Sequence, residues 1–208
     1  MNTKMLTAIL IVGLVGTLAG VGIYAHLVDT EKSTGNTFSA SSGFDLKTMD
    51  WDETEWKDGV TLTWTATGMK PGDIFLFPGK WVALSWLGPL TPGSLEVTCN
   101  YSVIEEEPQT EADTDPNTNL NPDSMAKQMI ILSLKYNGVE YADDISDIDG
   151  NEKITFFDLK NAPLTNLPIP SSNDGGTFFR LSVKFSEDAG NDFQGDTFDL
   201  TMIFTLKQ

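Results

Sequence analysis

Two segments of this chain place an apolar residue at every second position, and this pattern constrains the fold most. They are residues 94–104 (SLEVTCNYSVI) and residues 197–206 (TFDLTMIFTL). Successive side chains of a strand point to opposite faces, so the pattern predicts two long strands that each cover a core with one face. The predicted inward residues are Leu95, Val97, Cys99, Tyr101 and Val103 in the first segment, and Phe198, Leu200, Met202, Phe204 and Leu206 in the second.

Four further segments have the composition of strands and are bounded by glycine, proline or asparagine turns. They are residues 59–69, 74–87, 128–138 and 177–185. Pro78-Gly79 interrupts the second, and the third also has features of a helix start. Many short strands with little helical periodicity predict an all-β fold. We expect a jelly-roll-like, two-sheet antiparallel β-sandwich with short helices or loops, preceded by an N-terminal hydrophobic signal segment.

Residues 1–25 have the features of an export signal. Lys4 supplies a positive charge, Met5 to Ile23 are uncharged, and Ala25 is a small residue at the end of the apolar run. We therefore expect a signal peptidase to cleave after Ala25 and to release a secreted protein at the cell surface. An uncleaved membrane anchor is the alternative. The expected mature chain, residues 26–208, is long enough for a single jelly-roll domain.

The chain is strongly acidic, with 30 Asp and Glu residues against 13 Lys and Arg residues and a net charge of −17. This charge argues against nucleic acid as a partner, and it suits a soluble surface protein that meets divalent cations. Residues 105–123 hold seven acidic residues and no basic one, and are expected to form a surface loop. Cys99 is the only cysteine, so it is expected to be a buried strand residue or to pair with a second chain.

Residues 147–158 (DIDGNEKITFFD) space oxygen-bearing side chains as in the twelve-residue calcium loops of EF-hands and dockerins, which they resemble. Ca²⁺ prefers such carboxylate and carbonyl oxygens. Glu152 stands where these loops usually have glycine, so a side chain has to take a sharp turn. An acidic, solvated turn between strands is the alternative. The candidate ligands are Asp147, Asp149, Asn151, the backbone carbonyl of Lys153, Thr155 and Asp158, and Ile154 is expected to anchor the loop to the core.

Several short motifs, in a fixed order along the chain, resemble the TasA/camelysin family of secreted bacterial and archaeal proteins. They are HLVD at residues 26–29, FSASSGFDL at 38–46, KPGD at 70–73 and FQG at 193–195. His26 stands where the family has a small residue, and Leu27 where it has an aromatic one. The resemblance implies a jelly-roll subunit of extracellular fibres, of the biofilm-matrix or bundling-pilus kind, that forms homopolymers.

In such fibres, the resemblance implies, the segment freed by signal cleavage leaves its own subunit and completes a sheet of the next one. Residues 26–38 are then the donor strand. Donation of this kind pairs the backbone groups of an exposed sheet edge. The residues alone also allow a disordered leader or an ordinary first strand. The candidate donor residues are His26, Leu27, Val28, Asp29 and Phe38.

Two other functions compete with a structural role. Camelysin-like proteins have been described as metallopeptidases, but His26 is the only histidine, so the residues of a zinc site or a Ser-His-Asp triad are missing and no enzymatic activity is expected. A calcium-dependent carbohydrate-binding or adhesion module is the second alternative, with polysaccharide as the partner. Trp51 and Trp56 are the expected exposed stacking residues, whereas Trp64, Trp81 and Trp86 are expected in the core.

Overall fold

The computed structural model describes residues 28–32, 43–58, 64–76, 81–105, 120–172, 176–190, 193 and 196–208. The expected signal segment with its cleavage site, the break at Pro78-Gly79 and most of the acidic segment 105–123 lie outside these residues. Within the described part, no helix is long and apolar enough to cross a membrane.

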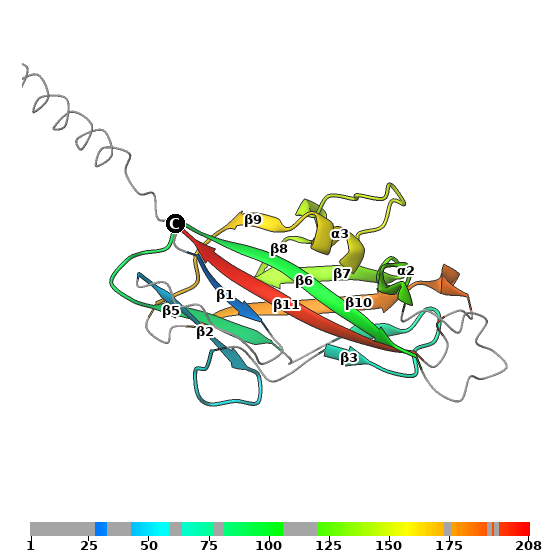
Figure 1. Ribbon diagram of the computed structural model, residues 1–208, viewed down its shortest axis with the longest axis horizontal. Coiled ribbons are helices and arrows are strands. Elements are labelled where there is room, and N and C mark those ends of the chain that lie inside the picture. Colours follow the sequence, from blue (N-terminus) through cyan, green and yellow to red (C-terminus); the bar gives the residue numbers. More distant parts are fainter. Residues whose placement is uncertain are drawn as a thin grey trace, which may run out of the picture.

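The first sheet, sheet A, is built around the two segments with the strictest alternation. β11 (Thr197–Lys207) pairs antiparallel with β6 (Ser94–Ile104) along its whole length, and the two strands run side by side in Figure 1. β9 (Leu164–Leu167) pairs with the far edge of β6. The other edge of β11 is covered by two short strands, β1 (Val28–Lys32) and β3 (Trp64–Ala66).

The second sheet, sheet B, is centred on β10 (Thr177–Phe185). One edge of β10 pairs with β7 (Met129–Tyr136). The other edge of β7 pairs with the short strand β8 (Val139–Glu140), which follows it after a tight turn. The other edge of β10 pairs with β4 (Ile74–Leu76) and β5 (Val82–Leu87), and β5 pairs in turn with β2 (Asp45–Asp50). All of these pairings are antiparallel.

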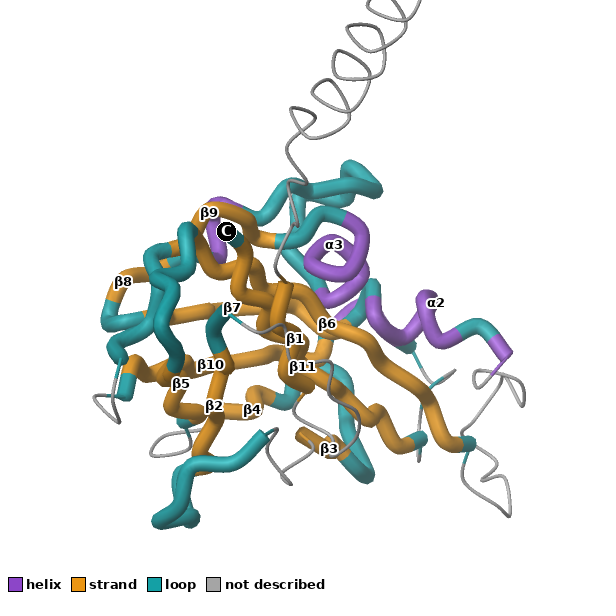
Figure 2. Tube along the Cα trace, turned by 60° about the vertical axis from the view of Figure 1, so that its left-hand side comes forward, coloured by secondary structure: helices purple, strands orange, loops and turns teal. Residues whose placement is uncertain are grey.

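The chain passes repeatedly from one sheet to the other. β6, β9 and β11 belong to sheet A, whereas β7, β8 and β10 belong to sheet B. Neighbouring strands in each sheet are therefore mostly distant in sequence, which is the wrapping of a jelly roll. The two sheets pack face to face (Figure 2) and confirm the predicted two-sheet antiparallel sandwich.

The core lies between the sheets and contains the side chains that alternation predicts. All ten predicted inward residues of β6 and β11 are buried. Phe204 of β11 meets Phe179 of β10 edge to face, with ring centroids 5.1 Å apart, so this aromatic pair joins the two sheets. Phe198 stacks between Tyr101 and Phe156 at centroid distances of 5.5 and 5.9 Å.

Short helical segments fill the connections. α2 (Pro122–Ala126) ends just before β7, so the predicted strand in 128–138 is confirmed and its helical features belong to the preceding turn. The described residues also include the helix α3 (Phe156–Asn161) and the 3₁₀ turns η2 (Ala142–Asp144) and η3 (Glu187–Ala189).

Cys99 is a buried residue of β6, as predicted. Its side chain is 3% exposed, and its Sγ lies 3.5 Å from the carbonyl oxygen of Phe156. Burial raises the pKa of this thiol far above its ordinary value because the thiolate would be poorly solvated. In this fold the thiol is therefore not exposed for a bridge to a second chain.

The aromatic pair between the sheets predicts a large difference between two substitutions. Phe204→Ala should lower the free energy of unfolding by about 3–5 kcal/mol, because it leaves a cavity between the sheets. Ile104→Ala, at a side chain that is 55% exposed, should change it by no more than about 0.5 kcal/mol. Urea unfolding followed by tryptophan fluorescence measures both, and equal losses would contradict the assigned core.

Candidate functional site

The segment between Ile145 and α3 folds into a tight loop around Asp147. The carboxylate of Asp147 accepts the backbone N–H groups of Gly150, Asn151 and Glu152, at 2.7, 3.3 and 2.8 Å. These bonds stabilise the ionised carboxylate and hold the pKa of Asp147 below its ordinary value, and the bond from Glu152 contributes most. The small stabilisation that goes with them is present above the ordinary pKa of aspartate and is lost as the pH falls through the lowered one.

Glu152 takes the sharp turn that the sequence predicts. Its φ is 64°, the left-handed conformation that costs a non-glycine residue roughly 1–2 kcal/mol. Gly150 also has a positive φ, 71°, and adopts it without that cost. The twelve-residue loop thus has its bend at the position where calcium loops have glycine, although the residue there is glutamate.

Asp158 closes the loop from the first turn of α3. Thr155 is the N-cap of this helix and forms a capping box with Asp158. One oxygen of Asp158, Oδ2, accepts the N–H and the hydroxyl of Thr155 at 2.8 and 2.6 Å, and the other accepts the N–H of Ile148 at 2.9 Å. Asp158 is fully buried and receives no hydrogen bonds from water. The three donors take the place of water and offset the cost of burying the carboxylate.

Ile154 anchors the loop to the sandwich, as predicted. Its side chain packs against the core, and its carbonyl oxygen accepts the N–H of Ile131 in β7 at 2.8 Å. A bridge between Thr155 and Ile130 continues this pairing. The loop is therefore fixed to sheet B at one point and passes directly into α3.

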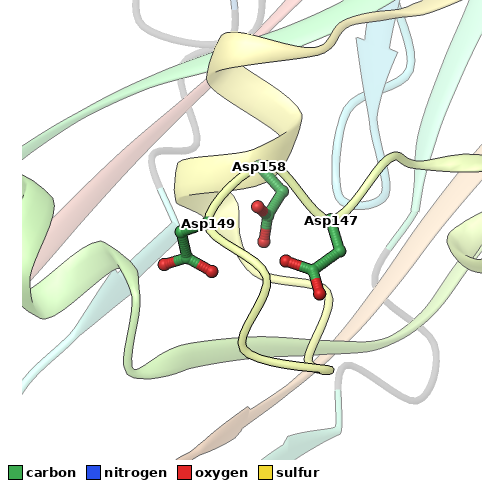
Figure 3. Close-up of side chains that lie close together, drawn as sticks. All are labelled: Asp147, Asp149 and Asp158. Carbon is green, nitrogen blue, oxygen red and sulfur yellow. The ribbon is translucent and has the colours of Figure 1, made fainter.

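Three of the predicted ligands come together in the structure. Asp147, Asp149 and Asp158 each offer one carboxylate oxygen, and these atoms lie within 4.8 Å of one another (Figure 3). Oδ1 of Asp149 is buried without a hydrogen-bond partner, while its Oδ2 lies 3.4 Å from the ammonium group of Lys127. Three converging carboxylates with an unpaired buried oxygen fit a hard cation, so the cluster can hold a metal ion.

The side chains of the other three ligand residues make other contacts. The side-chain oxygen of Asn151 accepts the N–H of Lys153 at 2.8 Å. The ammonium group of Lys153 pairs with Asp188 at 2.8 Å, which does not involve the backbone carbonyl that is its predicted ligand atom. Thr155 donates its hydroxyl hydrogen to Asp158, so its hydroxyl group serves to cap α3.

The second predicted site, the N-terminal donor segment, is described in part. Val28 and Asp29 belong to β1, whereas His26, Leu27 and Phe38 lie outside the described residues. β1 pairs with β11 of its own chain, in a register that runs from Val28 opposite Lys207 to Lys32 opposite Ile203. The segment that follows the expected cleavage site is thus an edge strand of sheet A.

The KPGD motif forms a tight turn at the end of β10. The carboxylate of Asp73 accepts the N–H of Lys70 at 2.9 Å, and Gly72 has a φ of 91° that suits the third position of such a turn. The N–H of Gly72 donates to the carbonyl oxygen of Phe185, and the N–H of Phe185 to that of Asp73. In the FQG motif, Phe193 is buried against Phe185, and Gln194 and Gly195 lie outside the described residues.

The tryptophans follow the predicted division only in part. Trp51 is 40% exposed, as predicted, but Trp56 is half-buried. Trp86 is half-buried and packs against the core. Trp81 is also half-buried but meets the exposed ring of Phe178, so it lies on the outer face of sheet B. The side chain of Trp64 lies outside the described part.

Sequence reasoning missed two contributions to the loop. The capping role of Thr155 and Asp158 is visible in the sequence as TFFD, because a threonine followed three residues later by an acidic residue marks a helix start. The approach of Lys127 to Asp149 carries no such sequence signal, since α2 and the loop are joined only by the fold.

Comparison with known proteins gives no assignment: no protein-family model matches the chain, and no curated protein is significantly similar to it.

The two roles in the aspartate cluster can be separated by isosteric substitutions. Asp158→Asn should lower the free energy of unfolding by about 1–3 kcal/mol without metal, because its new amide group has to face an N–H or hydroxyl donor. Asp149→Asn removes the same charge from a carboxylate that has one unpaired oxygen and one long ion pair with Lys127, and should cost less, no more than about 1 kcal/mol. Urea unfolding in EDTA tests this order, and a larger cost for Asp149→Asn would contradict it.

Proposed function

We propose that the protein is an exported structural subunit of extracellular fibres of the TasA/camelysin kind, with no catalytic role. In this proposal, residues 26–38 leave their own subunit and complete sheet A of a neighbouring copy. The observation that carries it is the position of β1, an edge strand that directly follows the expected cleavage site and pairs with β11. The motif resemblance supplies the expectation of a fibre.

The backbone of β11 favours such an exchange. Five consecutive residues of β11, from Ile203 to Lys207, have their free edge covered by β1. Without β1, this edge would present unpaired N–H and C=O groups beside the buried side chains of Phe204 and Leu206, which is a template for another strand. The β1 segment of a second copy has the same sequence and so satisfies the same register, as in domain swapping.

Donation by identical strands leads to open assembly. Each subunit that gives its β1 to the next one has its own β11 edge available for a third, and this head-to-tail relation generates a filament when it does not close into a ring. A self-complementary dimer is the closed form of the same exchange. We propose the open filament and not the closed dimer.

Cysteine pairs distinguish pairing within a chain from pairing between chains. Thr30 and Thr205 face each other across β1 and β11, so Thr30→Cys with Thr205→Cys, in a Cys99→Ser background, places two thiols at disulfide distance. Oxidation before assembly should lock β1 in its own subunit and abolish filaments in electron micrographs. Oxidation after assembly should give a ladder of covalent multimers on a non-reducing gel.

A matched pair on the same strand provides the control. Thr65 of β3 faces Asp199 of β11, and their side chains form a hydrogen bond of 2.8 Å. Thr65→Cys with Asp199→Cys should oxidise within one chain both before and after assembly, and should leave filaments unchanged. Filaments from oxidised Thr30→Cys/Thr205→Cys monomers, or no ladder after assembly, would contradict strand donation.

We further propose that the cation of the aspartate cluster is Ca²⁺ and that it acts as a structural staple. Asp147, Asp149 and Asp158 would hold it, and its charge would relieve the repulsion among the three carboxylates. A ligand that binds only the folded state stabilises it in proportion to the logarithm of its concentration. The effect is therefore on stability and requires no second loop.

Thermal unfolding tests the calcium proposal. The unfolding temperature should rise with free Ca²⁺ and return to its starting value in EDTA, and Asp149→Asn should reduce this rise at least severalfold. Asp188→Asn, a substitution that removes an exposed carboxylate paired with Lys153, is the control and should keep the full response. An identical rise in the Asp149→Asn variant would show that the ion binds elsewhere.

A further inference from the structure

The outer face of sheet B carries two unpaired cations side by side. Lys135 of β7 and Arg180 of β10 are directly opposite in the antiparallel register. Both are exposed, and neither forms an ion pair with a carboxylate that the structure describes, although most of the described lysines do. Like charges in opposite positions on two strands destabilise a sheet. Such a pair is unexpected in a chain with a net charge of −17.

The acidic residue opposite Lys135 attracts it electrostatically but directs its hydrogen bonds to other groups. Glu140 of β8 is the other cross-strand partner of Lys135. Its carboxylate accepts the hydroxyl of Ser133 at 2.6 Å and the N–H groups of Leu134 and Ala142 at 2.6 and 3.3 Å. The two cations are thus left facing solvent.

Aromatic rings adjoin the cations. Phe178 lies two residues before Arg180 on the same face of β10 and is 43% exposed. The ring of Trp81 meets it edge to face, with centroids 4.8 Å apart and planes at 73°. This contact fixes the orientation of the Phe178 ring and leaves it accessible.

These groups line an open pocket of about 260 Å³. Its walls are Lys135, Arg180, Phe178 and the turn Asn137-Gly138. Both turn residues have a positive φ, 51° and 78°, as in a type I′ hairpin, and the N–H of Asn137 donates to the carbonyl oxygen of Phe178 at 2.9 Å. The backbone of the pocket is therefore held in place by the hairpin and by β10.

We propose that this pocket binds a carboxylated sugar, of the uronate class, within an acidic polysaccharide. The guanidinium group of Arg180 can hold a carboxylate through two parallel hydrogen bonds, and Lys135 adds a second charge. The exposed ring of Phe178 offers a stacking face for the C–H groups of a pyranose ring. A neutral sugar would leave both cations unsatisfied, and an acidic peptide would leave the aromatic face without a ring to stack on.

The net negative charge of the protein does not prevent this binding. At physiological ionic strength charges are screened beyond about 8 Å, so a short ligand in the pocket experiences mainly Lys135 and Arg180. The pocket contains none of the aspartates of the 147–158 loop, and binding requires neither Ca²⁺ nor polymerisation. The inference is thus independent of the proposed fibre.

The test is isothermal titration calorimetry of the full-length protein in EDTA with tetragalacturonate, and with maltotetraose as the neutral sugar. Tetragalacturonate should bind and maltotetraose should bind at least about tenfold more weakly. Lys135→Gln with Arg180→Gln should weaken tetragalacturonate binding at least tenfold. Lys184→Gln is the matched control, because Lys184 has the same charge on the same strand but is paired with Glu187, and it should bind as the wild type does.

Two further titrations test the role of the Arg180 side chain and the preference for a sugar. Arg180→Lys retains the charge but loses the planar fork, and should bind several-fold more weakly than the wild type. A synthetic peptide of residues 105–115 should not compete with the sugar. Absence of tetragalacturonate binding, equal binding of both sugars, or unchanged binding in the double variant would overturn the proposal, and binding of the peptide alone would reassign the pocket to contacts between copies of this chain.

Discussion

The pairing of β11 with three other strands holds sheet A together. β6 covers one edge along eleven register positions, while β1 and β3 share the other edge. The same strand sends Phe204 across the core to Phe179, so it also connects the two sheets. One edge of β11 is thus paired with one long strand, and the other is paired with two short ones. This difference in strand length is the physical basis of our proposal that β1 exchanges between copies while the rest of the sandwich stays intact.

The aspartate loop reinforces the sandwich at a different place. Its Ile154 pairs with β7 of sheet B, and α3, which follows at once, lies against β6 of sheet A. The hydroxyl of Thr98 in β6 donates to the carbonyl oxygen of Leu159 at 3.2 Å, which ties the helix to that sheet. A cation between Asp147, Asp149 and Asp158 would therefore act on a unit that spans both sheets. Asp158 already serves this unit through its three hydrogen bonds, so the loop has a structural purpose with or without an ion.

The sequence predicts the sandwich because a two-residue period identifies a half-buried strand without knowledge of its partners. The bounds of β6 and β10 agree with their predicted segments, and β11 extends one residue further. Short elements cannot be predicted in this way because they contain too few residues to show a period. The helix α3 has six residues, fewer than two full turns, and the strand β8 has two. The spacing of the aspartates predicts the cluster because all three lie in one loop. The pocket on sheet B depends on residues from β7 and β10 that only strand register brings together, and no local pattern reports that register.

The burial of Cys99 has a consequence for the chemistry of its thiol. Oxidation and disulfide exchange proceed through the thiolate, and the raised pKa of this thiol makes that form scarce. Its position in β6, under the carbonyl group of Phe156, also denies access to oxidants and to other thiols. A lone cysteine on the surface would be free to form disulfides with other chains. In the core, Cys99 packs as a small apolar side chain and is unreactive.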